Sequence, residues 1–107
     1  MDAAVPQLPP QQVQQALEAA EPPLLLDVRN PPELVIDGRI DGAVNIPLFE
    51  LQQRAGELPP GREIICLCKS GMRSLNAAGF LRQRGLHASS MSGGLLAWAA
   101  AGLPVAR

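Results

Sequence analysis

Residues 64–74 read IICLCKSGMRS, and the predicted fold is built around this segment. Its first four residues are all apolar, which is the pattern of a short strand buried on both faces. Gly71 and its polar neighbours indicate a tight loop, and residues 75–84 then carry a helical pattern. The order strand, loop, helix is typical of α/β proteins. We therefore expect the rest of the chain to pack around this unit.

Cys68 stands at the mouth of this loop, where the first helical turn leaves backbone N–H groups without partners. These groups and the helix dipole stabilise negative charge, so the thiolate of Cys68 is favoured over the thiol. Gly71 permits the turn, while Lys69 and Arg73 add positive charge. A lone cysteine is usually a buried structural residue, but the glycine and the two cations favour a reactive thiol here.

The composition describes one domain spanning residues 1–107, with a proline-rich and mobile segment at 1–10. The chain is 47% hydrophobic, which is enough for a single core. Nine basic and ten acidic residues give a net charge of −1 without a run of like charge, so we expect no nucleic-acid or membrane partner. A leader pattern and a membrane-spanning apolar run are both lacking, which predicts a cytoplasmic protein.

The cysteines and the single histidine indicate neither a disulfide nor a metal site. In an extended strand, the Cα atoms of Cys66 and Cys68 lie near or beyond the separation that a disulfide tolerates. Two free cysteines fit a reducing compartment. With His87 they offer at most three soft ligands and lack the paired spacing of a zinc site, so we expect no metal and no other cofactor. His87 follows a turn and is interpreted as a solvated loop residue.

A second buried strand is predicted upstream, at residues 24–28, where an apolar run ends in a charge. Asp27 and Arg29 fall at its carboxyl end, the side on which open α/β sheets bind ligands, so both are candidates for the site. Before this strand, apolar residues at 13, 16, 17 and 20 predict a packing helix between two Pro-Pro pairs.

The remaining elements carry weaker signals. We expect a turn or helix start at 30–33, an edge strand at 43–45, a small helix at 48–55, a last strand at 88–91 and a final helix after residues 92–94. In the helix at 75–84, Gly79 is expected to allow close approach to the sheet, and Gly85 to cap the C-terminus. Trp98 is expected in the core.

Four segments together resemble the rhodanese domain family, in the family's own order: Asp27-Val28-Arg29, Gly38 to Pro47, Cys68 to Ser74, and Gly93-Gly94 to Trp98 with Gly102-Leu103-Pro104. The resemblance covers nearly the whole chain. It implies a three-layer α/β fold in which a central five-stranded parallel sheet is flanked by helices. It also implies that Cys68 accepts a sulfane sulfur as a persulfide and hands it to a thiophilic acceptor.

The resemblance implies substrate-binding residues in the loop and on the wall beside it: Lys69, Ser70, Gly71, Met72, Arg73, Asp27 and Arg29. The loop supplies convergent N–H donors for a persulfide anion, and Arg73 closes it. For Asp27 and Arg29, a buried ion pair that holds the strand to the loop is an equal alternative. The chain departs from the family pattern at Arg39 and Leu34, which affects the rim of the cavity and the preferred donor.

Three classes of function fit such a chain. A sulfurtransferase is favoured by Cys68 and by the four residues between it and Arg73. A phosphatase or arsenate reductase on this fold has one more residue there, because a tetrahedral oxyanion needs a wider cradle. A non-catalytic interaction or sulfur-carrier module is typical of members whose cysteine is replaced. We therefore expect a monomeric enzyme that takes a small anionic donor such as thiosulfate and a thiol, cyanide or protein acceptor.

Overall fold

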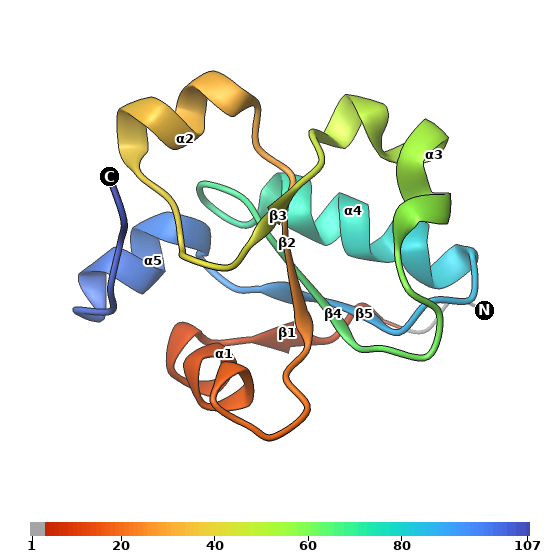
Figure 1. Cartoon of the computed structure of the whole chain (residues 1–107), viewed down its shortest axis with the longest axis horizontal. Helices are drawn as coiled ribbons and strands as arrows, with labels where there is room; N and C mark the ends of the chain where they lie inside the picture. Colours follow the sequence, from red (N-terminus) through yellow and green to blue (C-terminus); the bar gives the residue numbers. More distant parts are fainter. Residues whose placement is uncertain (1–3) are drawn as a thin grey trace.

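The computed structural model describes residues 4–107 and contains one five-stranded sheet in which every pairing is parallel (Figure 1). The strands are β1 (Gln7–Leu8), β2 (Leu24–Asp27), β3 (Val44–Asn45), β4 (Ile64–Leu67) and β5 (Ala88–Met91), and their order across the sheet is β1-β5-β4-β2-β3. The α/β fold with a five-stranded parallel sheet is thereby confirmed.

Helices cover both faces of this sheet, and two apolar clusters fill the space between the layers. One face carries α1 (Pro10–Leu17) and α5 (Gly94–Ala100). The other carries α4 (Met72–Gln83) together with the short helices η1 (Leu48–Glu50), α3 (Leu51–Arg54) and η2 (Ala55–Glu57). The helix α2 (Pro31–Asp37) buries no residue and follows the carboxyl end of β2. Within residues 4–107, none of the helices is long and apolar enough to span a membrane.

The strand β4 lies in the middle of the sheet, between β2 and β5. Ile64 and Cys66 belong to the cluster under α4, whereas Ile65 and Leu67 belong to the cluster under α1 and α5. All four side chains are buried because alternate residues of a strand point to opposite faces and both faces are covered. This explains why the run at 64–67 is continuously apolar rather than alternating.

The strand β1 was not predicted from the sequence. Gln7 pairs with Ser90 and Leu8 with Met91, which makes β1 a parallel edge strand beside β5. A strand of two residues is too short to show a period-two pattern, so sequence periodicity does not reveal it. The mobility expected for residues 1–10 falls partly on residues 1–3, which lie outside the described residues, and stays a prediction.

The predicted helices exist, but two of their ends differ from the prediction by three residues. The first helix ends at Leu17, so Ala20 lies in the exposed turn that follows it. The helix after the loop begins at Met72, three residues before the expected 75, because Gly71 already occupies its N-terminal cap position. Helix ends are set by capping geometry rather than by apolar periodicity, which accounts for both differences.

The structure contradicts one of the two glycine predictions for the helix α4 and confirms the other. A Cβ at Gly79 would lie 3.7 Å from Val5 Cγ2, an ordinary contact, so the close approach expected there is wrong. Gly85 caps the helix as expected, with φ of +85° and its N–H bonded to the Arg82 carbonyl at 3.0 Å. Trp98 lies in the core, where its indole N–H donates to the Pro104 carbonyl at 2.7 Å.

Candidate active site

The loop from Cys68 to Gly71 joins the carboxyl end of β4 to the start of α4. Gly71 adopts φ of +111°, a conformation that residues with a side chain rarely reach. A Cβ there would also lie 3.2 Å from the backbone nitrogen of Gly93. The glycine therefore serves both the turn and the contact with the segment that precedes α5.

The N-terminus of α5 holds the loop from the opposite side. Leu95 N–H donates to the carbonyl of Cys68 at 2.8 Å, and Leu96 N–H donates to the carbonyl of Lys69 at 3.1 Å. A Cβ on Gly94 would collide with both of these carbonyl oxygens. The glycine pair at 93–94 is thus required so that free N–H groups of one helix can bind the reactive loop.

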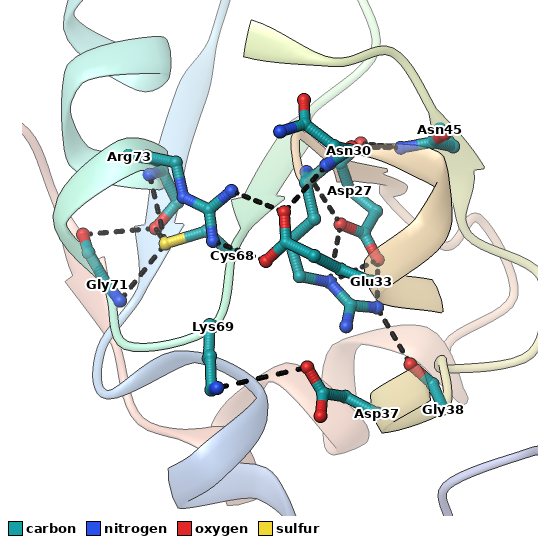
Figure 2. A network of polar contacts seen from close by, with 12 residues as sticks. Asp27, Asn30, Glu33, Asp37, Gly38, Asn45, Cys68, Lys69, Gly71 and Arg73 are labelled. Atoms are coloured by element: carbon teal, nitrogen blue, oxygen red, sulfur yellow. Dashed lines mark hydrogen bonds and ion pairs between the residues drawn. The ribbon is translucent and has the colours of Figure 1, made fainter. Parts of the chain in front are cut away.

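Hydrogen-bonding groups surround the sulfur of Cys68, and two of them are backbone N–H groups that donate to it (Figure 2). Gly71 N–H lies 3.1 Å from Sγ, Ser74 N–H lies at 3.3 Å, and Ser74 Oγ lies at 3.4 Å. The residue is only 1% exposed, so these donors take the place of water around the sulfur.

The pKa of the Cys68 thiol lies below its ordinary value, for reasons that partly oppose one another. Burial by itself would raise this pKa. Hydrogen bonds from the Ser74 hydroxyl, and then from the backbone N–H groups of Ser74, Gly71 and Ser70, outweigh burial and favour the thiolate. The direction of this pKa shift agrees with the prediction for the loop, but the largest lowering contribution comes from the Ser74 hydroxyl, which the sequence analysis did not place in the site.

Cys66 has the opposite environment, although it is only two residues away. It is fully buried within β4, where desolvation and then the neighbouring Cys68 raise the pKa of its thiol to about 12. The pKa values of the two thiols are therefore shifted in opposite directions, and the catalytic role of Cys68 stays a prediction. Among residues 4–107, no three His, Cys, Asp or Glu side chains gather into a group that could hold a metal ion.

Arg73 extends from α4 to α2, where it forms a paired contact with Glu33 (Figure 2). Its two terminal nitrogens lie 2.7 and 2.8 Å from the two carboxylate oxygens of Glu33. Glu33 also accepts a hydrogen bond from Asn30 N–H at 2.9 Å, which completes a capping box at the start of α2. Any contact between Arg73 and a substrate stays a prediction.

Glu33 is a site residue that the sequence reasoning missed. The hydrogen bond from Arg73 lowers the pKa of its carboxyl group to about 2. The spacing Asn30-x-x-Glu33 directly after the strand at 24–27 was the available signal, since it indicates a capping box. The partner 40 residues away could not be read from that signal.

We expect Glu33→Gln to destabilise the protein, because it weakens the paired contact with Arg73. The expected loss is only about 1 kcal/mol, because 34% of the Arg73 side chain and 25% of the Glu33 side chain are exposed and screened by solvent. The pKa of Glu33 is lowered from 4.5 to about 2, so the contribution is complete above about pH 4.5 and is lost as the pH falls through about 2. Denaturant titrations near neutral pH and at about pH 3 measure this difference. Glu57→Gln, which breaks a more exposed pair with Arg54, is the control; an equal loss in both variants would contradict the prediction.

Asp27 and Arg29 form a buried ion pair, as one of the two alternatives predicts, but the pair is joined to Gly38 rather than to the loop at 68–71. Arg29 Nη2 lies 2.7 Å from Asp27 Oδ2 and donates to the carbonyl of Gly38 at 3.0 Å. Both side chains are completely buried, and the pair connects the end of β2 to the segment that follows α2. Among residues 4–107, Arg29 Nη1 finds no hydrogen-bond partner. A direct contact of either residue with a substrate stays a prediction.

The other loop side chains point outward. Met72 is 71% exposed and Ser70 is exposed, and a contact of either side chain with a substrate stays a prediction. Lys69 Nζ lies 3.9 Å from Asp37 Oδ2, a long and half-exposed ion pair that leaves the ammonium accessible (Figure 2). Arg39, one of the two departures from the family pattern, is exposed. Its backbone exchanges two hydrogen bonds with the backbone of Ala106, at 2.7 and 2.8 Å.

Comparison with known proteins agrees with this geometry. A family model described as the rhodanese-like domain matches residues 9–101. A protein named sulfurtransferase from Allochromatium vinosum is 37% identical over 92 residues, which cover 85% of each chain.

Solved structures show the same likeness. A rhodanese-related protein from Thermoplasma volcanium superposes with a TM-score of 0.86 at 32% identity, covering 94% of this chain and 96% of that one. The Bacillus anthracis protein CoADR-RHD matches 89% of this chain with 16% of its own length, at 34% identity and a TM-score of 0.82. With its cysteine cradle, its sheet order and these relatives, the chain belongs to the rhodanese-like domain family and is related to small sulfurtransferases.

Proposed function

We propose that the chain is a sulfurtransferase that moves a sulfane sulfur from a donor such as thiosulfate to a thiol or cyanide through a persulfide on Cys68. The observation that carries this proposal is the convergence of Gly71 N–H, Ser74 N–H and Ser74 Oγ on one sulfur atom within 3.4 Å. Donors placed this closely fit a thiolate and the persulfide anion that follows it. The name of the Allochromatium vinosum relative supports the same reaction class.

The reaction has two nucleophilic steps. In the first, the Cys68 thiolate attacks the outer sulfur of thiosulfate, the S–S bond of the donor breaks, and sulfite leaves with its electron pair. In the second, cyanide or a thiolate attacks the outer sulfur of the persulfide, and the Cys68 thiolate leaves. The cradle stabilises the anion on the enzyme in both resting and loaded forms, and no cofactor takes part in either step.

Charge and exposed apolar surface support the proposed partners. Lys69 and Arg73 attract a dianionic donor, although Asp37 and Glu33 moderate their field. The most exposed large hydrophobic residues follow the carboxyl ends of the strands, where Cys68 also lies: Val35, Ile36, Phe49, Met72 and Leu96. Such a rim suits a protein acceptor that presents a thiol to the cradle.

The direct test is the intact mass of the protein after incubation with thiosulfate, followed by cyanide. We expect a gain of one sulfur atom that cyanide removes, because a persulfide sulfur is electrophilic. Thiocyanate released in step with the mass loss confirms the transfer. A protein whose mass does not change with thiosulfate or with a persulfide donor would contradict the proposed function.

A further inference from the structure

Two buried hydroxyl groups lie in a row behind the Cys68 sulfur. Ser74 is in the first turn of α4 and Ser90 is in β5, and both are buried. Their Oγ atoms are 2.8 Å apart, and Ser74 Oγ is 3.4 Å from the sulfur. The hydroxyl pair therefore connects the sulfur of Cys68 to β5, the strand beside β4.

The number of protons decides how this row works. Ser74 has a single O–H proton but three polar neighbours, namely Gly71 O at 3.1 Å, the Cys68 sulfur and Ser90 Oγ. When Cys68 is a thiol, it can donate to Ser74 Oγ while Ser74 donates to the Gly71 carbonyl. When Cys68 loses its proton to water, the Ser74 O–H has to turn to the sulfur in order to stabilise the anion.

Ser90 decides whether that turn is favourable. If Ser90 donates to Ser74 Oγ, the Ser74 proton is free to bind the sulfur. If Ser74 donated to Ser90 instead, the anion would lose this donor. Within the described chain, Ser74 Oγ is the partner that the structure shows for the Ser90 hydroxyl, so the first arrangement satisfies every group.

A serine at this position needs an explanation. Ser90 pairs in register with Cys66 of the central strand and is 1% exposed, a place where an apolar side chain is the ordinary choice. Burying a hydroxyl costs free energy unless it is hydrogen-bonded. An exclusively structural pair of serines would change stability but leave the thiol of Cys68 as it is, which makes the two roles separable.

We propose that Ser90 is a positioning residue whose hydroxyl donates to Ser74 Oγ and thereby directs the Ser74 proton onto the Cys68 sulfur when that sulfur is anionic. The same chain serves the persulfide anion, so the benefit for catalysis rests on the proposed function. The charged and titratable groups around the sulfur are Arg73 from α4, Lys69 from the loop, the Asp27–Arg29 pair from β2 and Cys66 from β4. None of them is altered by a change at Ser90.

The test measures the alkylation rate of Cys68 by iodoacetamide against pH, without any sulfur donor, with the labelled site read from peptide masses. Removing the hydroxyl in Ser90→Ala is expected to raise the thiol pKa by about 0.5 to 1 unit, which slows alkylation below that pKa roughly three- to tenfold. Ser90→Thr keeps the hydroxyl and is expected to retain the wild-type profile. Ser89→Ala, on the other face of the same strand, is the matched control.

The outcomes separate the roles. A pKa shift in Ser90→Ala that is absent from Ser90→Thr and Ser89→Ala supports positioning. An unchanged profile in Ser90→Ala, or an equal shift in Ser90→Thr, overturns it. If Ser90→Ala does not fold, Ser90→Cys is measured instead. A raised pKa of Cys68 is expected there too, because a thiol is similar in size to a hydroxyl but is a weaker donor, and an unchanged pKa overturns the proposal. A Ser90-dependent pKa in a protein that transfers no sulfur would refute the proposed function alone.

Discussion

Cys68→Ser is expected to reduce sulfur transfer to the uncatalysed background, the largest effect of any single substitution in this chain. A serine hydroxyl is not ionised near neutral pH and forms no persulfide, so both steps of the reaction lose their nucleophile. The cradle of N–H groups would remain, but it would have no anion to stabilise. Thiocyanate formation from thiosulfate and cyanide, together with intact mass, measures the loss.

Cys66→Ser is the matched control for Cys68→Ser, because both replace a buried cysteine by the same residue two positions apart. It is expected to keep most of the activity. It is also expected to lose about 1–3 kcal/mol of stability, because it buries a hydroxyl in an apolar cluster that offers it no dedicated hydrogen-bond partner. Cys66→Ala separates the two effects by omitting the hydroxyl. A Cys68→Ser protein that turns over thiosulfate at the wild-type rate, or a folded but inactive Cys66→Ser protein, would refute the assignment.

Adding one glycine after Ser70 is expected to lower sulfur transfer roughly a hundredfold or more, because each lost donor of an anion cradle typically costs that much. Gly71 N–H and Ser74 N–H converge on the sulfur only at the present loop length, and Gly71 also packs against Gly93. The extra residue would move the N–H groups away from the single sulfur atom. A glycine added after Gly61, in an exposed turn with open space around it, is the control insertion.

The same two proteins test the alternative on this fold. We expect no hydrolysis of an aryl phosphate by the wild type, because the donors around Cys68 lie too close for the oxygens of a phosphate. Phosphatase activity in the lengthened loop is not required, since a general acid and substrate contacts are separate needs. Aryl phosphate turnover by the wild type that disappears in Cys68→Ser would move the chain to the phosphatase class.

Much of the fold could be predicted because its signals are local. The apolar residues of the segments 24–28 and 64–67 indicate strands buried on both faces, and the helices follow from periodicity and from proline and glycine at their ends. The edge strand β1 escaped prediction because two residues carry no pattern, and its place is set by pairing with β5, far along the chain. The expectation for Gly79 failed because spacing does not report what lies opposite a helix.

The loop sequence alone indicated Cys68 as the candidate nucleophile and backbone N–H groups such as that of Gly71 as its donors, because one short loop joins them. It did not indicate Ser74, whose N–H and hydroxyl also lie beside the sulfur. The distant groups that complete the site follow from the three-dimensional packing of the elements. Glu33 meets Arg73 across 40 residues, Ser90 meets Ser74 across 16, and the N–H of Leu95 binds the carbonyl of Cys68. These contacts depend on strand order and register, which bring distant chain segments together near the carboxyl ends of the strands. Local periodicity in the sequence does not report strand order or register, so it could not predict these contacts.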